Sequence, residues 1–137
     1  MGERMRISED KHFSADALKE LFTSVGWELE MNPAILQSAM LHSSHVLSMW
    51  EGDKLLGLIR SMDDDCWSAN IDCLVVHKDY QSKGIATQLI KCLIDKIGHI
   101  EYISVSPNES KNFGLYENCG FHRVEDGGLL QIVKSNK

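Results

Sequence analysis

The stretch over residues 74–97 constrains the fold most strongly, because it joins an apolar strand to an amphipathic helix through a glycine-containing loop. The apolar run at residues 73–76 is typical of a strand covered on both faces near the centre of a sheet. Beyond the loop, apolar residues recur at helical spacing from Ile85 to Ile97, and Gly98 ends the pattern. The segment therefore predicts a strand–loop–helix unit inside a layered domain.

The loop itself, QSKGIA at residues 81–86, has the composition of an anion-binding turn. Gly84 permits unusual backbone conformations, and the first amides of the following helix carry a partial positive charge to which Lys83 adds a full one. Neither a Walker loop nor a three-glycine dinucleotide fingerprint occurs in the chain. Taken alone, the loop is explained equally well as a phosphate site or as an ordinary strand-to-helix turn.

The remaining periodicity predicts an α+β domain. Strands are expected at residues 4–8, 46–50, 55–62, 67–76, 102–105, 121–124 and 129–133. Helices are expected after Ser14, from Pro33, over residues 85–97 and over residues 110–118. The segment 67–105 is long enough for a parallel crossover, and no repeat or linker interrupts the chain, so a single domain over residues 1–137 is expected.

Composition narrows the range of partners. The 137 residues carry 14 basic and 20 acidic side chains, a formal net charge of -6, which disfavours nucleic acid and anionic membranes and favours a cationic small molecule. No apolar run reaches the roughly 18 residues of a membrane span. The four cysteines show neither metal nor disulfide spacing, and the pair His42 and His45 lacks a third ligand. We therefore expect a cytoplasmic protein without a metal.

Two motifs together resemble the GNAT acetyltransferase superfamily. The Q-x-x-G-x-A pattern at residues 81–86 resembles its [Q/R]-x-x-G-x-[G/A] acetyl-CoA loop, and NESKNFGLYENCGF at residues 108–121 resembles its second motif, which ends in Y-E-x-x-G-F. The resemblance covers residues 46–133. It implies a mixed α+β fold with a mostly antiparallel sheet of about six to seven strands, splayed between its parallel fourth and fifth strands, and about four helices. It also implies an N-acetyltransferase that uses acetyl-CoA as co-substrate.

The resemblance implies coenzyme contacts from both motifs. Loop amides would hold the pyrophosphate, and the unpaired end of the preceding strand, often bulged, would bond the pantetheine arm. The expected contacts are Leu74, Val75, Val76, Gln81, Ser82, Lys83, Gly84, Ile85, Ala86, Thr87, Asn108 and Tyr116. Many family members have proline where this chain has Lys78, so a looser turn into the loop is expected.

Two residues are candidates for acid–base catalysis. Tyr116 aligns with the family's tyrosine that protonates the departing thiolate, and its alternative role is packing beside Phe113. Asp72 lies on the central strand, one residue from the position where family members often carry a carboxylate, so it acts as base or faces away as a structural partner. A connector glutamate or water is the alternative base. Cys73, in an apolar run, is disfavoured as a nucleophile, which favours direct attack in a ternary complex.

The resemblance places the acceptor between the helix connector and the turn near Asp126. Residues expected to bind the acceptor are Trp27, Glu28, Glu30 and Glu125. Carboxylates there favour a small cationic primary amine, although a solvated acidic rim explains them equally well. A protein N-terminus or lysine is the alternative acceptor, and a non-catalytic coenzyme-binding domain is the alternative of another class. A homodimer is common in the superfamily, but no interface signature is evident in the chain.

Overall fold

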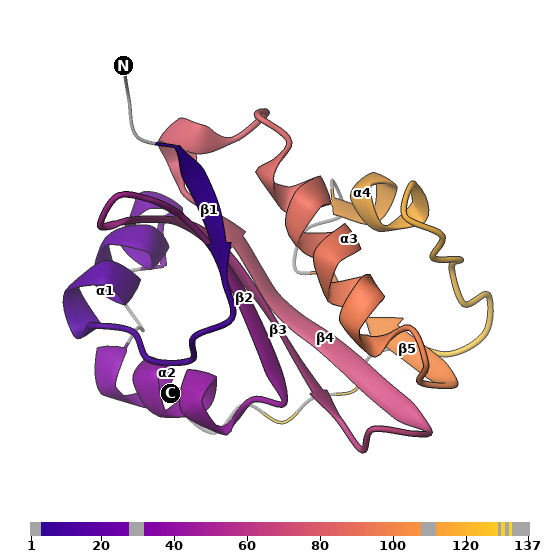
Figure 1. Cartoon of the computed structure of the whole chain (residues 1–137). Coiled ribbons are helices and arrows are strands. Elements are labelled where there is room, and N and C mark those ends of the chain that lie inside the picture. Colours follow the sequence, from indigo (N-terminus) through magenta and orange to yellow (C-terminus); the bar gives the residue numbers. More distant parts are fainter. Residues whose placement is uncertain (1–3, 28–31, 108–111, 129, 131, 133–137) are drawn as a thin grey trace.

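A computed structural model of the protein describes residues 4–27, 32–107, 112–128, 130 and 132 (Figure 1). This part of the chain forms five strands, four α-helices and one 3-10 turn. In chain order they are β1 (Met5–Ser8), α1 (Ala15–Ser24), α2 (Pro33–His42), β2 (His45–Glu51), β3 (Lys54–Asp63), β4 (Ser68–Val76), the 3-10 turn η1 (Lys78–Tyr80), α3 (Ile85–Ile97), β5 (Tyr102–Val105) and α4 (Phe113–Glu117). The expected α+β class is confirmed.

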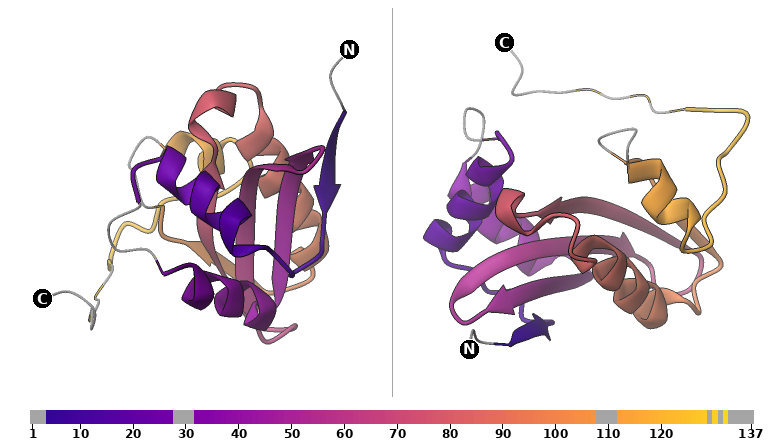
Figure 2. Two further views of the ribbon diagram at one scale, coloured as in Figure 1. Left: turned by 90° about the vertical axis from the view of Figure 1, so that its left-hand side faces the viewer. Right: turned by 90° about the horizontal axis from the view of Figure 1, so that it is seen from above.

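The five strands form one sheet in the order β1-β2-β3-β4-β5. Neighbouring strands are antiparallel except for the parallel pair β4 and β5, which the α3 crossover joins as predicted. Helices α1 and α2 cover one face of the sheet, and α3 covers the other (Figures 1 and 2). The molecule is therefore a three-layer domain in which both sheet faces are buried.

Helix α3 lies unusually close to the sheet because β3 carries a glycine beneath it. A Cβ atom added at Gly57 would lie 3.0 Å from the Val75 carbonyl oxygen and 3.3 Å from the Ile85 side chain. Ile85, Leu89 and three further apolar residues of α3 are buried against the sheet. This packing sets the position of the α3 N-terminus, where the predicted anion loop ends.

The sheet splays where β4 runs past β5. The two strands pair only over residues 68–71 of β4, although β4 continues to Val76. Just beyond the paired part, Cys73 has a left-handed φ of 61°, and both Cys73 and Leu74 oppose Ile59 of β3. One extra residue facing a single partner is a β-bulge, the irregularity expected at this strand.

One prediction about secondary structure needs correction. Residues 121–124 form no strand: Phe121 packs edge-to-face on Tyr116 at 5.4 Å, and Val124 is 81% exposed. Most of the other predicted strand, 129–133, lies outside the described residues. The count of six to seven strands is therefore too high for the described part. No helix in the described ranges has the length and apolar character needed to cross a membrane.

Candidate active site

The N-terminus of α3 presents backbone amides without a side-chain cap. Gly84, the residue before the helix, has a left-handed φ of 83°, and no side chain among the described residues caps this helix end. Ser82 is also left-handed, with φ 65°. Left-handed residues beside right-handed ones turn successive N–H groups toward a common point, which is how backbone nests bind anions.

Side chains hold the loop in place from both sides. Gln81 closes it by donating from Nε2 to the Val76 carbonyl oxygen at 3.1 Å. Before it, the Nδ1 atom of His77 accepts the Asp79 amide at 3.2 Å, and the Lys78 amide donates to Ser24 Oγ at 3.1 Å. We expected a looser turn because Lys78 replaces the family's proline. The structure instead shows a hydrogen bond from the Lys78 amide, which proline could not form because it has no N–H.

The loop forms one wall of a cleft of about 480 Å³. All of the predicted loop and strand contacts except Lys83 line it, whereas Lys83 is exposed on the loop. The lining residues are Val25, Trp27, Leu74, Val75, Val76, Tyr80, Gln81, Ser82, Gly84, Ile85, Ala86, Thr87, Asn112 and Leu115. None of these side chains is charged, so a bound anion would meet backbone amides rather than ion pairs.

A smaller recess adjoins the cleft where β4 and β5 part. Asp72, Cys73 and Tyr116 line it with residues from the end of β5, and Leu74 and Asn112 line both the recess and the cleft. The structure thus brings the two predicted catalytic residues to one place, at the far end of the β4 segment that β5 leaves unpaired.

Tyr116 is almost fully buried, with 3% of its surface exposed. Burial raises the pKa of its phenol well above the usual range, and the negative charge of Asp72 adds to the shift. The side chain is therefore protonated at neutral pH and can donate a hydrogen bond into the recess. Its ring packs on Phe121, so a structural role and a donor role are both compatible with its position.

Asp72 faces the recess, but it has a partner that the sequence analysis did not identify. Its Oδ2 atom lies 3.0 Å from Nη2 of Arg60, the residue opposite it on β3, and Arg60 Nη1 donates to Ser43 Oγ at 3.2 Å. The Asp72 side chain is 46% exposed. The pair fixes the position of the carboxylate and leaves it open to the solvent side of the recess.

Cys73 has the properties of an inert thiol. Burial raises its pKa to about 12, with a further contribution from the charge of Asp72. Since the thiolate is the nucleophile, a thiol protonated at neutral pH reacts poorly.

Of the predicted acceptor residues, the structure describes only Trp27 and Glu125. Trp27 lines the cleft beside the α3 loop, with its ring 5.5 Å from that of Phe22. Glu125 and Asp126 are exposed and line neither cavity, and residues 121–124, which were expected to form a strand before them, do not do so. Glu28, Glu30 and Asn108 lie outside the described residues.

Four lining residues were not predicted from the sequence: Val25, Tyr80, Asn112 and Leu115. Tyr80 directly precedes the loop glutamine, and Leu115 directly precedes Tyr116, so proximity to the motifs was an available signal for both. In the described ranges no group of three or more His, Cys, Asp or Glu side chains could hold a metal ion.

Comparison with known proteins identifies the family. The acetyltransferase (GNAT) domain family matches residues 9–129. The uncharacterized N-acetyltransferase ycf52 of Pyropia yezoensis is 27% identical over 126 residues, which are 88% of this chain and 72% of that protein.

Solved structures share the fold. A GNAT-family acetyltransferase of Streptococcus pneumoniae has a TM-score of 0.80 at 25% identity, covering 96% of this chain and 99% of that one. A probable acetyltransferase of Staphylococcus aureus has a TM-score of 0.83 at 17% identity, covering 95% and 100%. With its family domain spanning most of its length and its splayed sheet, this chain belongs to the GNAT acetyltransferases.

Proposed function

We propose that the protein transfers the acetyl group of acetyl-CoA to a primary amine by direct attack in a ternary complex. One observation carries the proposal: a single cleft runs from the uncapped amides of α3, along the unpaired end of β4, to the recess that holds Tyr116 and Asp72. This order matches the order of chemical groups in the coenzyme, with pyrophosphate first, pantetheine amides next and thioester last.

The residues present fit the coenzyme. Amides from Gln81 to Thr87 would hold the pyrophosphate, and the backbone of Leu74, Val75 and Val76 would bond the pantetheine arm in place of a fifth strand. Val25, Tyr80 and Leu115 supply apolar walls along the same path. When bound, acetyl-CoA supplies an activated acetyl thioester. Lys83, outside the lining, would add only a solvent-screened charge.

The proton balance assigns separate roles to the two residues of the recess. As the C–N bond forms and the C–S bond breaks, the amine must release protons and the sulfur must gain one. Asp72, directly or through water, would take a proton from the amine and pass it to solvent. Tyr116 would donate to the leaving sulfur. Solvent would then return a proton to Tyr116, whose raised pKa keeps the phenol protonated at the start of the next turnover.

The preferred acceptor is a small cationic amine. The net charge of -6 and the carboxylate of Asp72 beside the recess both favour a positively charged acceptor. The Arg60 pair gives one reason to keep the non-catalytic alternative, because a carboxylate engaged by a guanidinium is a less available base. A protein amine remains the other alternative acceptor.

Thiol release with a panel of polyamines, amino sugars, lysine and peptides tests the proposal. Tyr116→Phe is expected to lower kcat by about 100-fold, in the range of general acid–base effects, while the acetyl-CoA dissociation constant changes less than about twofold. Tyr102→Phe is the matched control, because Tyr102 is exposed on β5.

Each outcome has a distinct meaning. An unchanged kcat in Tyr116→Phe would remove the donor role. Coenzyme binding without turnover on any amine would favour the non-catalytic domain, and turnover confined to peptides would favour a protein acetyltransferase. Failure to bind acetyl-CoA would reject the proposal as a whole.

A further inference from the structure

We infer that Ser24 is a positioning residue, whose hydroxyl sets the distance between the two walls of the cleft by tying the end of α1 to the turn η1. The inference rests on the proposed function, because it assigns a role in coenzyme binding. It concerns a residue outside both motifs that resemble the family's.

The Ser24 hydroxyl uses both of its hydrogen-bonding functions. Its Oγ atom donates to the Leu21 carbonyl oxygen at 2.7 Å and accepts the Lys78 amide at 3.1 Å. The first bond is part-buried, and the second is exposed and joins residues that are 54 positions apart in the chain. A hydroxyl that donates to one group and accepts from another is fixed in orientation. The bond to Lys78 therefore holds α1 at a fixed distance from η1; we call this bond the strut.

This hydrogen bond joins two segments whose following residues both line the cleft. Val25 and Trp27 follow Ser24 directly and line the cleft from the α1 side. Tyr80 and Gln81 follow Lys78 and line it from the loop side. A change in the distance between Ser24 and Lys78 would therefore move the walls relative to each other.

A second connection joins the same two elements and keeps them together if the first is lost. Glu20 of α1 lies 3.1 Å from Lys54 Nζ and 3.6 Å from His77 Nε2 through one carboxylate oxygen, and Lys54 lies over the Tyr80 ring at 5.6 Å. Removal of the Ser24 hydroxyl should therefore loosen the cleft rather than unfold the domain.

The donor of this hydrogen bond, the Lys78 amide, can also be removed without changing Ser24. Lys78 is the first residue of the 3-10 turn, and His77 before it has φ -51° and ψ 137°, a conformation that a following proline accepts. Lys78→Pro would remove the N–H and leave the backbone path intact. Ser24→Ala and Lys78→Pro are therefore two independent ways to break one hydrogen bond.

The experiment is a double-mutant cycle on the whole protein, with acetyl-CoA affinity measured by titration calorimetry and turnover measured by thiol release. Ser24→Ala and Lys78→Pro are each expected to raise the acetyl-CoA dissociation constant and KM about 3- to 10-fold, with kcat changed less than about twofold. The double variant should be no worse than either single one, because the same bond is lost only once. Ser24→Thr should restore affinity, and Thr23→Ala, which removes the neighbouring exposed hydroxyl, should have no effect.

Multiplicative losses in the double variant, or an unchanged affinity in Ser24→Ala, would overturn the inference while leaving the proposed function intact. If Ser24→Ala failed to fold, Lys78→Pro with Ser24 present would decide the question through its affinity alone. Failure of the unmodified protein to bind acetyl-CoA would overturn the proposed function and this inference together.

Discussion

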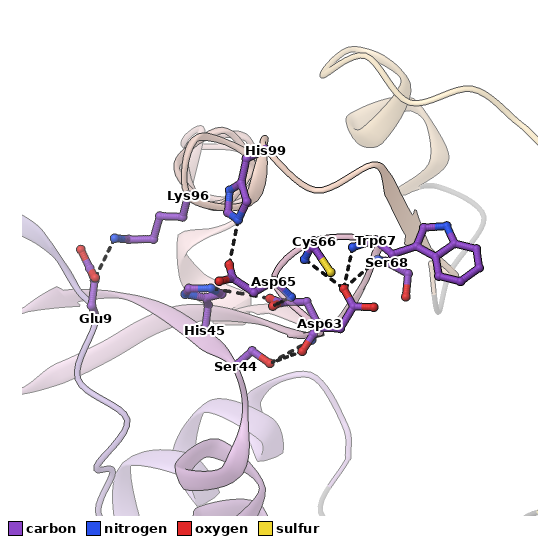
Figure 3. A network of polar contacts seen from close by, with 11 residues as sticks. Glu9, Ser44, His45, Asp63, Asp65, Cys66, Trp67, Ser68, Lys96 and His99 are labelled. Carbon is purple, nitrogen blue, oxygen red and sulfur yellow. Dashed lines mark hydrogen bonds and ion pairs between the residues drawn. The ribbon is translucent and has the colours of Figure 1, made fainter.

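The two ends of β4 carry similar rows of backbone amides that are used in opposite ways. Before β4, the amides of Cys66, Trp67 and Ser68 converge on one oxygen of Asp64, at 3.0, 2.7 and 3.0 Å (Figure 3). These bonds lower the pKa of Asp64 to about 2. After β4, the amides at the start of α3 meet no capping side chain in the described part of the chain. One turn thus contains its own anion, and the other presents its donors to a ligand.

The surroundings of the two turns also differ in the charge of their side chains. Near the Asp64 turn, Asp65 lies 2.8 Å from His99, and Lys96 lies 2.7 Å from Glu9 (Figure 3). The cleft beside α3 is lined by uncharged side chains. In the Asp64 turn the amides and nearby charged groups are paired within the protein, which indicates a structural role. The uncapped amides of α3, in a cleft without charged side chains, favour a ligand that carries negative charge.

Giving the α3 turn a built-in carboxylate should abolish the difference. Ala86→Asp places an anion in the first turn of α3, where it would occupy the open amides and repel pyrophosphate. We expect acetyl-CoA affinity to fall by at least about 100-fold, while the thermal midpoint holds or rises, since acidic residues stabilise helix N-termini. Calorimetric titration and thermal melts measure both quantities, with Ala86→Ser as the control. Retained affinity would show that these amides do not bind the pyrophosphate.

Removing the charge from the Asp64 turn should change acid stability rather than coenzyme binding. The folded pKa of Asp64 is lowered from 3.8 to about 2, so its contribution to stability is present above its unfolded pKa and is lost as the pH falls through about 2. We expect Asp64→Asn to be less stable than the unmodified protein near neutral pH, and the difference to shrink as the pH falls from about 4 to about 2. Urea unfolding across this range measures it. A difference that stays constant with pH would contradict the assignment.

The smallest effect is expected for Lys83, the one charged loop residue predicted as a contact. Because it is exposed and outside the cleft lining, Lys83→Gln should weaken acetyl-CoA binding only about two- to threefold, and added salt should reduce this effect. Affinity measured at low and high salt tests this. A loss as large as that of Ala86→Asp would mean that the side chain, not the backbone, dominates phosphate binding.

Much of the fold could be predicted because its signals are local. The apolar period of α3 and the length of the crossover each determine an element within one short stretch of the sequence. The strand at residues 121–124 was wrongly predicted because alternation alone does not show whether a segment finds a pairing partner. Residues 121–124 instead leave the sheet after Phe121 packs on Tyr116.

The residues predicted from contiguous segments gather at one cleft, whereas Glu125, predicted from a distant segment, does not join them. The loop residues are contiguous, so their spacing already places them on one helix N-terminus, and the structure confirms that all but Lys83 line the cleft. The acceptor residues were assigned from distant segments, and Glu125 lies away from both cavities. Long-range placement depends on how segments pair, which local patterns do not specify.

Local patterns along the chain were sufficient to predict a strand, a loop and a helix, and the resemblance of residues 81–86 and 108–121 to two family motifs added the GNAT assignment. Only the tertiary structure decided which way the strand's residues face and what they contact. The bulge at Cys73 shifts the β3–β4 register by one residue, and Asp72 comes to lie opposite Arg60. The Ser24 hydroxyl likewise meets the Lys78 amide only once α1 has docked against η1. Such pairings depend on register and packing across the whole domain. Alternation of side chains along a strand does not show where a bulge inserts one extra residue and turns the following side chains to the opposite face.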